Sequence, residues 1–458
     1  MSRSYFLPGR RLPLVAALLV SIACGLASCC LDPVNQSRYF CLGETSDEEE
    51  AAIGAEYAPN FIAESGGPYP DTELSSYLEQ IVIDEMARKS HRPQLPWTFS
   101  VLNTSQINAF ALPGGRVFVT RGLLAQLESE AQFAHLMGHE IGHVTHRHAL
   151  RGQGRQLLFA VLIGTLGYVE SAIIDEDSPP LITGIAAGVG LLGMLKFSRD
   201  QELESDCRGV DYALLAGYDP REGRKTFELF LRLKEQSGQS AGLIEGLMST
   251  HPLDRDRIDG IDSYIAKAHP EVATRRDLKK SESSWTPQIA RLKRDHAVYE
   301  EHDKALALIA KARTEKHEAT LDEAETLLRK CVTQLPTHAT FHVALGALAL
   351  ERNNPAAALP HLDRACTLDT NNFGAFLYRG VAARKRGERP AARADLERAN
   401  ALYPINPLPC YLLGLTAEED RDSQAARTWY EKTMQLSPAD SEVHKHANER
   451  LVALTPKT

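Results

Sequence analysis

No apolar stretch of this 458-residue chain is long enough to predict a transmembrane helix. A helix that crosses a bilayer needs about 20 consecutive apolar residues, and residues 12–23, 157–168 and 181–195 form shorter stretches. An acidic, proline-containing segment separates the two internal stretches. We therefore expect residues 157–195 to form a buried helical hairpin with at most peripheral contact to a membrane, or alternatively a flexible lid.

Basic charge is also scarce. The chain has 51 Lys and Arg against 60 Asp and Glu, which gives a formal net charge of −9 at pH 7. Residues 1–28 contain three arginines and no acidic residue, so their removal takes the formal charge to −12. An acidic chain argues against nucleic acid as a partner.

The amino terminus has the pattern of a secretion signal. Arginines precede the apolar residues 12–23, as in a signal peptide spanning residues 1–28. The following L-A-S-C sequence resembles a bacterial lipobox, in which Cys29 becomes the first mature residue and carries lipid. Cys30 rather than Asp comes next, so we expect an outer-membrane lipoprotein. Ordinary cleavage to a soluble periplasmic protein is the alternative.

The motif H-E-x-x-H, His139 to His143, predicts a metal site. Apolar residues recur at three- and four-residue steps over residues 128–150 and predict a helix there. On a helix the two histidines share one face and can bind one Zn²⁺, while Glu140 can hold a water. Gly142 suggests that another segment approaches the helix closely. A helix that is merely rich in histidine is the alternative.

The third ligand is not supplied by the same helix. An extended H-E-x-x-H-x-x-G-x-x-H motif would need Gly and His where the chain has His146 and Ala149. Glu202 is the best candidate, on a second helix predicted from residue 197 to about 217. Asp206 shares its face and could orient a ligating histidine from outside the ligand set. Alternatively, both acids simply favour the first turns of a helix.

These motifs together resemble the HtpX-type and CAAX-protease-type zinc peptidases. Residues 107–119, INAFALPGGRVFV, are similar to the strand and turn that precede the zinc helix in that family. Residues 250–252, THP, followed by Arg257 and Ile258, are similar to its downstream motif. The resemblance implies an α+β, mainly helical gluzincin metallopeptidase domain with a small sheet.

The resemblance also implies a role for each matching residue. Zinc would be bound by His139, His143 and Glu202, which leaves a fourth position for water. Glu140 would act as general base and then as proton donor. His251 would cap the metal and hold the enzyme inactive; without the family, a histidine before a proline is usually a turn residue. Residues 108–119 would pair with an extended substrate, or form an ordinary hairpin.

The carboxy-terminal third repeats with a period of 34 residues, which is typical of tetratricopeptide repeats. We expect about four helix pairs over residues 303–438, an all-α solenoid, and a capping helix near 440–454. A solenoid of this kind binds proteins on its concave face, or alternatively is a structural tail. The recurring positions are Gly346, Gly380 and Gly414; Ala324, Ala358, Ala392 and Ala426; and Leu328, Leu362, Leu396 and Tyr430.

The eight cysteines show no C-x-x-C spacing that would predict a metal or redox motif. Cys331 and Cys366 lie on consecutive repeats, so a disulfide between them is one candidate pairing in an oxidising periplasm. Beyond Cys29, the cysteines are Cys30, Cys41, Cys207, Cys331, Cys366 and Cys410.

With its repeats, the whole chain resembles the BepA-like periplasmic proteases and chaperones of outer-membrane β-barrel assembly. That resemblance implies a zinc endopeptidase that degrades misfolded or stalled outer-membrane proteins and contacts the β-barrel assembly machinery through its repeats. The alternative is a chaperone or adaptor whose zinc site is normally capped. The secretion signal argues against a CAAX protease of cytosolic substrates. The expected divisions are a signal peptide (1–28), a peptidase domain (29–270) whose first helix covers 44–64, a linker (271–302) and a repeat domain (303–458).

Overall fold

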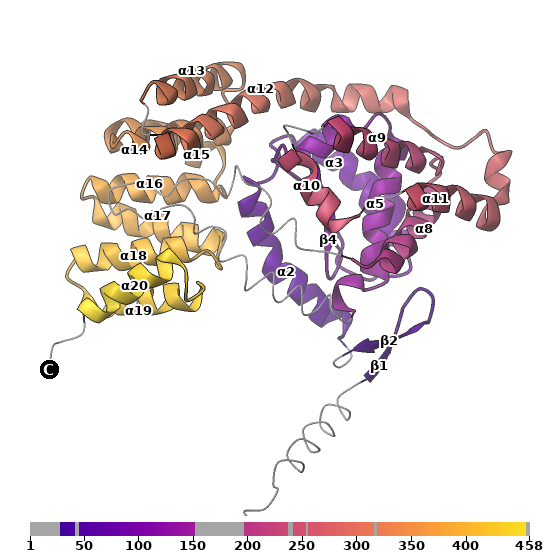
Figure 1. The fold of residues 1–458 in the computed structure, drawn as a ribbon, viewed down its shortest axis with the longest axis horizontal. Coiled ribbons are helices and arrows are strands. Elements are labelled where there is room, and N and C mark those ends of the chain that lie inside the picture. The colour runs from indigo at the N-terminus through magenta and orange to yellow at the C-terminus, as the bar shows by residue number, and fades with distance from the viewer. Residues whose placement is uncertain are drawn as a thin grey trace, which may run out of the picture.

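The computed structural model shows a mainly helical protein with two small sheets (Figure 1). The predicted hairpin of residues 157–195 and nearly all of the predicted signal peptide lie outside the residues that the structure describes. The described residues are 28–41, 45–151, 197–236, 241–252, 255–315 and 318–454.

The larger sheet separates two apolar clusters. Its strands are β3 (Thr98–Leu102), β4 (Ala109–Leu112) and β5 (Arg116–Thr120), in the order β3–β5–β4. Successive side chains of a strand point to opposite faces. Val117 and Val119 therefore join the main core with Ile141 of the metal-motif helix, while Phe118 packs with Phe61 on the other face.

The strand β4 is an edge strand, because within the described part of the chain it pairs with β5 alone. The turn that joins them contains Gly114 and Gly115 with φ of 77° and 91°, a conformation that glycine adopts without strain. Residues 108–119 thus form a hairpin whose first strand is the edge. Both readings of this segment, edge strand and hairpin, describe the structure.

The helix α2 (Asp47–Glu64) covers the second face of the sheet. Ser46 and Glu49 form the predicted capping box, in which each side chain accepts a hydrogen bond from the other residue's backbone N–H. The prediction of a first helix at this position is confirmed.

The two helices that carry the metal motifs, α5 (Glu130–Thr145) and α8 (Arg199–Leu215), pack against each other. A Cβ added to Gly142 would lie 2.9 Å from the Arg208 Cβ and 3.1 Å from the Ser205 Cα. The close approach expected at Gly142 is therefore the contact with α8. The helix α8 begins and ends close to its predicted limits.

The helix α5 ends earlier than predicted, at Thr145 rather than near residue 150. Arg147 has a φ of 56°, in the left-handed region that rarely suits a side chain. The chain therefore turns back, and the 3-10 turn η3 (His148–Leu150) lies beside α5 instead of extending it.

Among the described helices, none combines the length and apolar character that a bilayer crossing requires.

Further helices, turns and a two-stranded sheet complete the amino-terminal half. The remaining elements are β1 (Ser28–Leu31), β2 (Arg38–Cys41), α3 (Thr72–Glu79), η1 (Gln80–Met86), η2 (Ala87–Lys89), α4 (Arg121–Gln126), α9 (Glu222–Gln236), α10 (Ala241–Thr250), α11 (Arg255–Ala268) and η6 (Pro270–Ala273).

The carboxy-terminal half stacks into a curved array of helix pairs (Figure 1). At the recurring glycines the paired helices cross closely: a Cβ would lie 2.5 Å from Leu362 at Gly346 and 2.4 Å from Tyr430 at Gly414. The predicted tetratricopeptide architecture is confirmed. The helices are α12 (Glu282–Glu315), α13 (Glu318–Gln334), α14 (Ala339–Glu351), α15 (Pro355–Leu368), α16 (Phe373–Lys385), α17 (Arg389–Leu402), α18 (Pro407–Glu419), α19 (Ser423–Gln435) and the cap α20 (Glu442–Ala453).

Cys331 and Cys366 do not form the disulfide considered from the sequence. Both are buried free thiols, and so is Cys410. Cys207 is a half-buried free thiol. The Cys331 sulfur instead lies 3.4 Å from the Val298 carbonyl oxygen of α12. Cys30, near the amino terminus, is disulfide-bonded.

The stretch expected to be a linker, residues 271–302, is largely helical. The helix α12 begins at Glu282 and continues without interruption into the first repeat. Trp285 is buried in the core of the amino-terminal half and stacks on Phe133 with ring centroids 5.6 Å apart. The helix therefore attaches the repeats to the amino-terminal half, and α17 also contacts α2.

The same junction contains the partly buried histidine His296. Arg121 stacks on Tyr299 of α12, and its guanidinium lies 2.7 Å from the His296 Nδ1. Burial and the Arg121 charge lower the pKa of His296 to about 4. The unfolded chain binds this proton near pH 6.5 and the folded protein only near pH 4, so acid favours unfolding within that window.

We expect the free energy of unfolding of His296→Gln to fall less steeply than that of the wild type as the pH is lowered from 6.5 to 4. One proton fewer is taken up on unfolding, which reduces the slope of the unfolding free energy by up to ~1.4 kcal/mol per pH unit. Urea unfolding at a series of pH values measures the slope. An unaltered slope in His296→Gln would contradict the prediction.

Candidate metal centre

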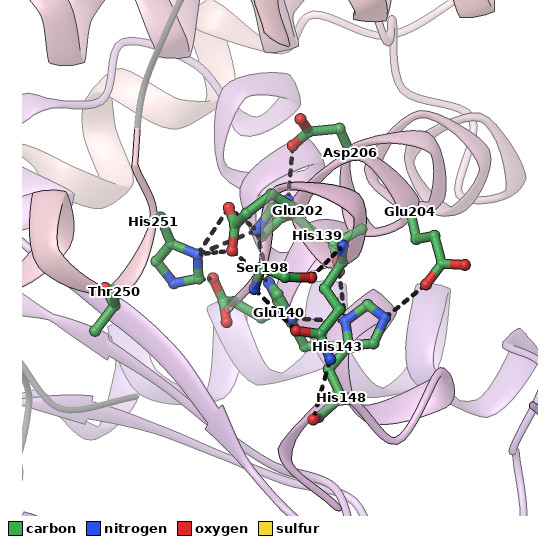
Figure 2. A network of polar contacts seen from close by, with 12 residues as sticks. His139, Glu140, His143, His148, Ser198, Glu202, Glu204, Asp206, Thr250 and His251 are labelled. Carbon is green, nitrogen blue, oxygen red and sulfur yellow. Dashed lines mark hydrogen bonds and ion pairs between the residues drawn. The ribbon is translucent and has the colours of Figure 1, made fainter. Parts of the chain in front are cut away.

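Three segments that are distant in the sequence converge on one buried cluster (Figure 2). The helix α5 contributes His139, Glu140 and His143, and α8 contributes Glu202. His251 directly follows α10. These five residues are at most 5% exposed.

The potential ligand atoms surround a point as the donors of one ion would. His139 Nε2 lies 3.0 Å from His143 Nε2 and 3.7 Å from a Glu202 oxygen. The other Glu202 oxygen is 3.5 Å from His143 Nε2. Donors about 2.0–2.2 Å from a tetrahedral Zn²⁺ are separated by roughly 3.3–3.6 Å, so these separations fit such an ion.

The fourth corner of the cluster is formed by His251. Its Nδ1 is 3.4 Å from His139 Nε2 and 3.0 Å from Glu202 Oε1. The ligating atoms of His139, His143, Glu202 and His251 all lie within 4.8 Å of one another. His251 therefore lies at the position where a fourth ligand of the ion would be.

The electrostatics of the cluster favour a cation. Burial raises the pKa of Glu202, but His251, His143 and Arg257 outweigh it and hold the pKa well below its usual range. Burial holds the pKa of His143 well below its ordinary value. Neutral imidazoles and an ionised carboxylate are the protonation states that a metal requires of its ligands.

Glu140 differs from Glu202 in its surroundings. Burial raises the pKa of Glu140, because fewer compensating charges lie close to it. Its Oε2 has no hydrogen-bond partner among the described residues, and its Oε1 is 3.6 Å from His251 Nε2. A carboxyl group with a raised pKa and a free oxygen can both accept and return a proton.

Asp206 and Arg257 support the cluster from behind. His139 Nδ1 lies 2.9 Å from Asp206 Oδ1, so the opposite ring nitrogen faces the other ligand atoms. Arg257 donates two hydrogen bonds to Asp206, at 2.8 and 2.7 Å, and its third nitrogen lies 2.7 Å from Glu202. Arg257 thus holds together the two acidic residues of α8.

Every site residue predicted from the sequence lies in or beside this cluster. The sequence identified Arg257 only as part of a motif and gave it no function, and it gave none to His148. Arg257 contacts Asp206, which lies 51 positions earlier on another helix. His148 contacts His143, five positions earlier, only because the chain turns back after α5. The spacing of residues within one helix does not reveal either contact.

The helix α10 lies against the residues that lead into the edge strand. Gly246 of α10 faces the Asn108 and Gln106 side chains, 3.4 and 3.5 Å from where its Cβ would be. All four residues of β4 are buried. The helix α10 therefore lies beside the point where the edge strand begins.

We expect Arg257→Lys to weaken metal binding by roughly 10- to 100-fold, the usual cost of losing a partner that orients a metal ligand. Lysine keeps the charge but cannot bind Asp206 with two parallel hydrogen bonds. Competition against a chromophoric chelator measures the affinity. The exposed Arg255→Lys on the same helix is the matched control, and equal affinities for the two variants would contradict this function of Arg257.

A helix bearing H-E-x-x-H, a carboxylate from a second helix and an edge strand define the class of H-E-x-x-H metallopeptidases. Residues 74–265 match the model of Peptidase family M48. The chain thus contains a family M48 domain, followed by a tetratricopeptide array, and the protein is a metalloendopeptidase.

Named relatives agree with this assignment. The chain is 27% identical to the beta-barrel assembly-enhancing protease of Yersinia pestis over 79% of this chain and 76% of the relative. The protein of the same name in Escherichia coli K12 is 27% identical over 66% and 63%. The mitochondrial metalloendopeptidase OMA1 of Arabidopsis thaliana is 34% identical over 37% and 32%.

Solved structures that resemble the chain include MamA, at 25% identity and a TM-score of 0.27 over 31% of this chain and 88% of MamA. The tetratricopeptide protein YrrB matches at 16% identity and a TM-score of 0.27, over 49% of this chain and 99% of YrrB.

Proposed function

We propose that the protein is a zinc endopeptidase of the bacterial envelope that acts on unfolded or misassembled outer-membrane proteins. The observation that carries the proposal is the buried convergence of His139, His143, Glu202 and Glu140. His139, His143 and Glu202 would hold the ion. When bound, zinc would supply the Lewis acidity that lowers the pKa of a water and polarises a peptide carbonyl.

The chain's own residues perform the proton transfers. Glu140 takes a proton from the attacking water through its unpartnered oxygen and then gives it to the leaving amine. Asp206, held by Arg257, keeps His139 in the ligating orientation. The edge strand β4 offers backbone groups to an extended substrate, which gives affinity without demanding a sequence.

His251 restrains this activity in our account. Its Nδ1 lies among the ligand atoms, so a substrate carbonyl and His251 compete for the same place. A shift of α10, which ends at Thr250, would carry His251 away from the other ligand atoms.

The relatives and the sequence support a proposed location and proposed partners. The relatives named beta-barrel assembly-enhancing proteases make outer-membrane barrel proteins the proposed substrates, and the β-barrel assembly machinery the proposed partner of the repeats. The secretion pattern of residues 1–28, with lipid at Cys29, would direct the chain to the outer membrane. A disulfide at Cys30 suits an oxidising compartment.

The divisions proposed for the chain are a signal peptide (1–28), a peptidase domain (29–270), a connection (271–302) and a repeat domain (303–458). The connection includes the first part of α12, which packs on the peptidase domain through Trp285. The repeat array would capture proteins close to the metal centre.

A second function has one observation in its favour. Because His251 lies in the ligand cluster, the peptidase would be inactive until released, and the protein would then act mainly as a chaperone or adaptor through its repeats. The test is cleavage of an unfolded outer-membrane barrel protein by the wild type and by His251→Ala. We expect His251→Ala to cleave faster, by roughly tenfold for ~1.4 kcal/mol of capping. No cleavage by either protein, with metal bound, would favour the chaperone.

A further inference from the structure

His148, which is not one of the histidines of the metal centre, lies directly behind it. His148 is fully buried, and its Nδ1 lies 2.9 Å from the Nδ1 of His143. The two rings meet edge to face, with centroids 4.9 Å apart. On its other side, His148 Nε2 lies 3.0 Å from a Glu204 oxygen. Glu204, His148 and His143 thus form a continuous chain of polar contacts (Figure 2).

The positions of the ring nitrogens fix the direction of this chain. His143 Nε2 faces His139 Nε2 at 3.0 Å and Glu202 at 3.5 Å, so it must be free of hydrogen if it binds an ion. The hydrogen of neutral His143 then resides on Nδ1 and is donated to His148 Nδ1. His148 must carry its own hydrogen on Nε2, where Glu204 accepts it.

Local structure holds His148 in this position. The left-handed conformation of Arg147 turns the chain back after α5, and η3 places His148 beside His143 instead of one turn further along the helix. Glu204 is itself held by Arg151 at 2.9 Å and by the Asn35 amide at 3.0 Å. The acceptor at the end of the chain is therefore fixed by two neighbours.

His139, the other histidine of the H-E-x-x-H motif, is also held by a polar residue outside the cluster. His139 contacts Asp206, which is held by Arg257, whereas His143 contacts His148, which is held by Glu204. We propose that His148, anchored by Glu204, is a positioning residue that fixes the ring orientation and tautomer of His143 for metal binding. This inference rests on the proposed function, in which His143 is a metal ligand.

An alternative is a second metal ion, because His146, His148 and Glu204 also form a group with ligand atoms within 4.8 Å. A cation already lies there, however. The Arg151 guanidinium forms ion pairs with Glu204 and with the buried Asp32, which also contacts His146 at 2.7 Å. Arg151 thus neutralises both carboxylates, and His148 turns its Nδ1 towards His143.

The test measures zinc stoichiometry and affinity of the full chain by competition against a chelator. His148→Leu removes the acceptor, and we expect a 10- to 100-fold loss of affinity for one zinc ion. In His148→Asn the amide oxygen can accept near the Nδ1 position, so most of the affinity should return. His146→Gln replaces the ring that stacks on His148, and this variant should bind zinc as the wild type does. If His148 only filled space, His148→Asn would not restore the zinc affinity that His148→Leu loses.

Glu204→Gln provides a variant that preserves shape if His148→Leu fails to fold. Its weaker acceptor should reduce zinc affinity severalfold, and unchanged affinity would overturn the inference. Two ions in the wild type, with one lost in both His146→Gln and His148→Leu, would assign a second metal site instead.

The ligand set itself is checked in parallel with Glu202→Gln. If zinc binding depends on Glu202 while the His148 variants bind normally, the positioning inference fails and the proposed function stands. If Glu202→Gln binds zinc as the wild type does, the proposed ligand set fails, and the positioning inference fails with it.

Discussion

Glu140→Gln is expected to bind zinc as tightly as the wild type and to hydrolyse peptides roughly 10²- to 10⁴-fold more slowly, the range that general acid–base catalysis contributes. Glutamine has nearly the same shape but cannot accept a proton from water. Glu140 is 1% exposed and burial raises its pKa, so a base in bulk solvent does not reach the place of its carboxylate. Initial rates of cleavage, measured in the His251→Ala background, give the ratio.

The control for this variant lies at the start of the same helix. Glu128→Gln changes an exposed carboxylate just before α5 and should leave both zinc binding and turnover unaltered. Turnover that persists in Glu140→Gln within about threefold of the wild type would exclude Glu140 as the base. Loss of zinc in Glu140→Gln would instead make it a ligand.

Arg92→Ala is expected to lower the free energy of unfolding by about 3–5 kcal/mol, as when one partner of a buried ion pair is removed. Arg92 is 2% exposed and donates to Glu50 at 3.0 and 2.7 Å. It also donates to the Val144 carbonyl at 2.9 Å, at the end of α5. Without Arg92, the buried carboxylate of Glu50 loses its principal partner.

The same pair connects the elements around the metal centre. Glu50 accepts a hydrogen bond from the Gly114 N–H at 3.1 Å and so holds the turn between β4 and β5 against α2. We therefore expect Glu50→Ala to be about as damaging as Arg92→Ala, and the double variant to cost less than the sum.

Urea unfolding measures these changes, with Arg88→Ala as the matched control. Arg88 pairs with Asp84 on the surface and its side chain is 65% exposed, so its loss should cost less than about 1 kcal/mol. Equal effects for Arg88→Ala and Arg92→Ala would show that the buried network contributes little.

Local sequence patterns predicted local structure well. The capping box at Ser46 and Glu49 and the helix that carries Glu202 depend on neighbours within one or two turns of helix, and the repeats are visible as a fixed period of 34 residues. Local patterns and a fixed period can both be recognised in a single sequence. The close contacts at Gly346 and Gly414 follow from the repeat in the same way.

The end of α5 could not be predicted from its apolar pattern. Periodicity favoured a helix to residue 150, but Arg147 adopts a left-handed conformation with φ of 56°. Its guanidinium lies 3.2 Å from Glu50 and donates to the Thr45 carbonyl at 2.9 Å. Contacts with residues about 100 positions earlier stabilise this turn, and they are visible only in the folded chain.

Long-range contacts also explain what the sequence missed around the site. Arg257 reaches Asp206 across 51 positions, and Glu204 reaches His148 across 56. The charged stretch taken for a linker contains Trp285, whose indole N–H donates to the Leu127 carbonyl at 3.1 Å. Charge and serine content alone do not reveal that one face of this segment packs on the peptidase domain.

The most direct test of the account is a crystal structure of the zinc-loaded chain with anomalous data recorded on both sides of the zinc absorption edge. We expect one zinc peak per chain, bonded to His139 Nε2, His143 Nε2 and a Glu202 oxygen at about 2.0–2.2 Å, with Glu140 beside it and not bonded. A peak among His146, His148 and Glu204 with none at the first cluster would contradict the account.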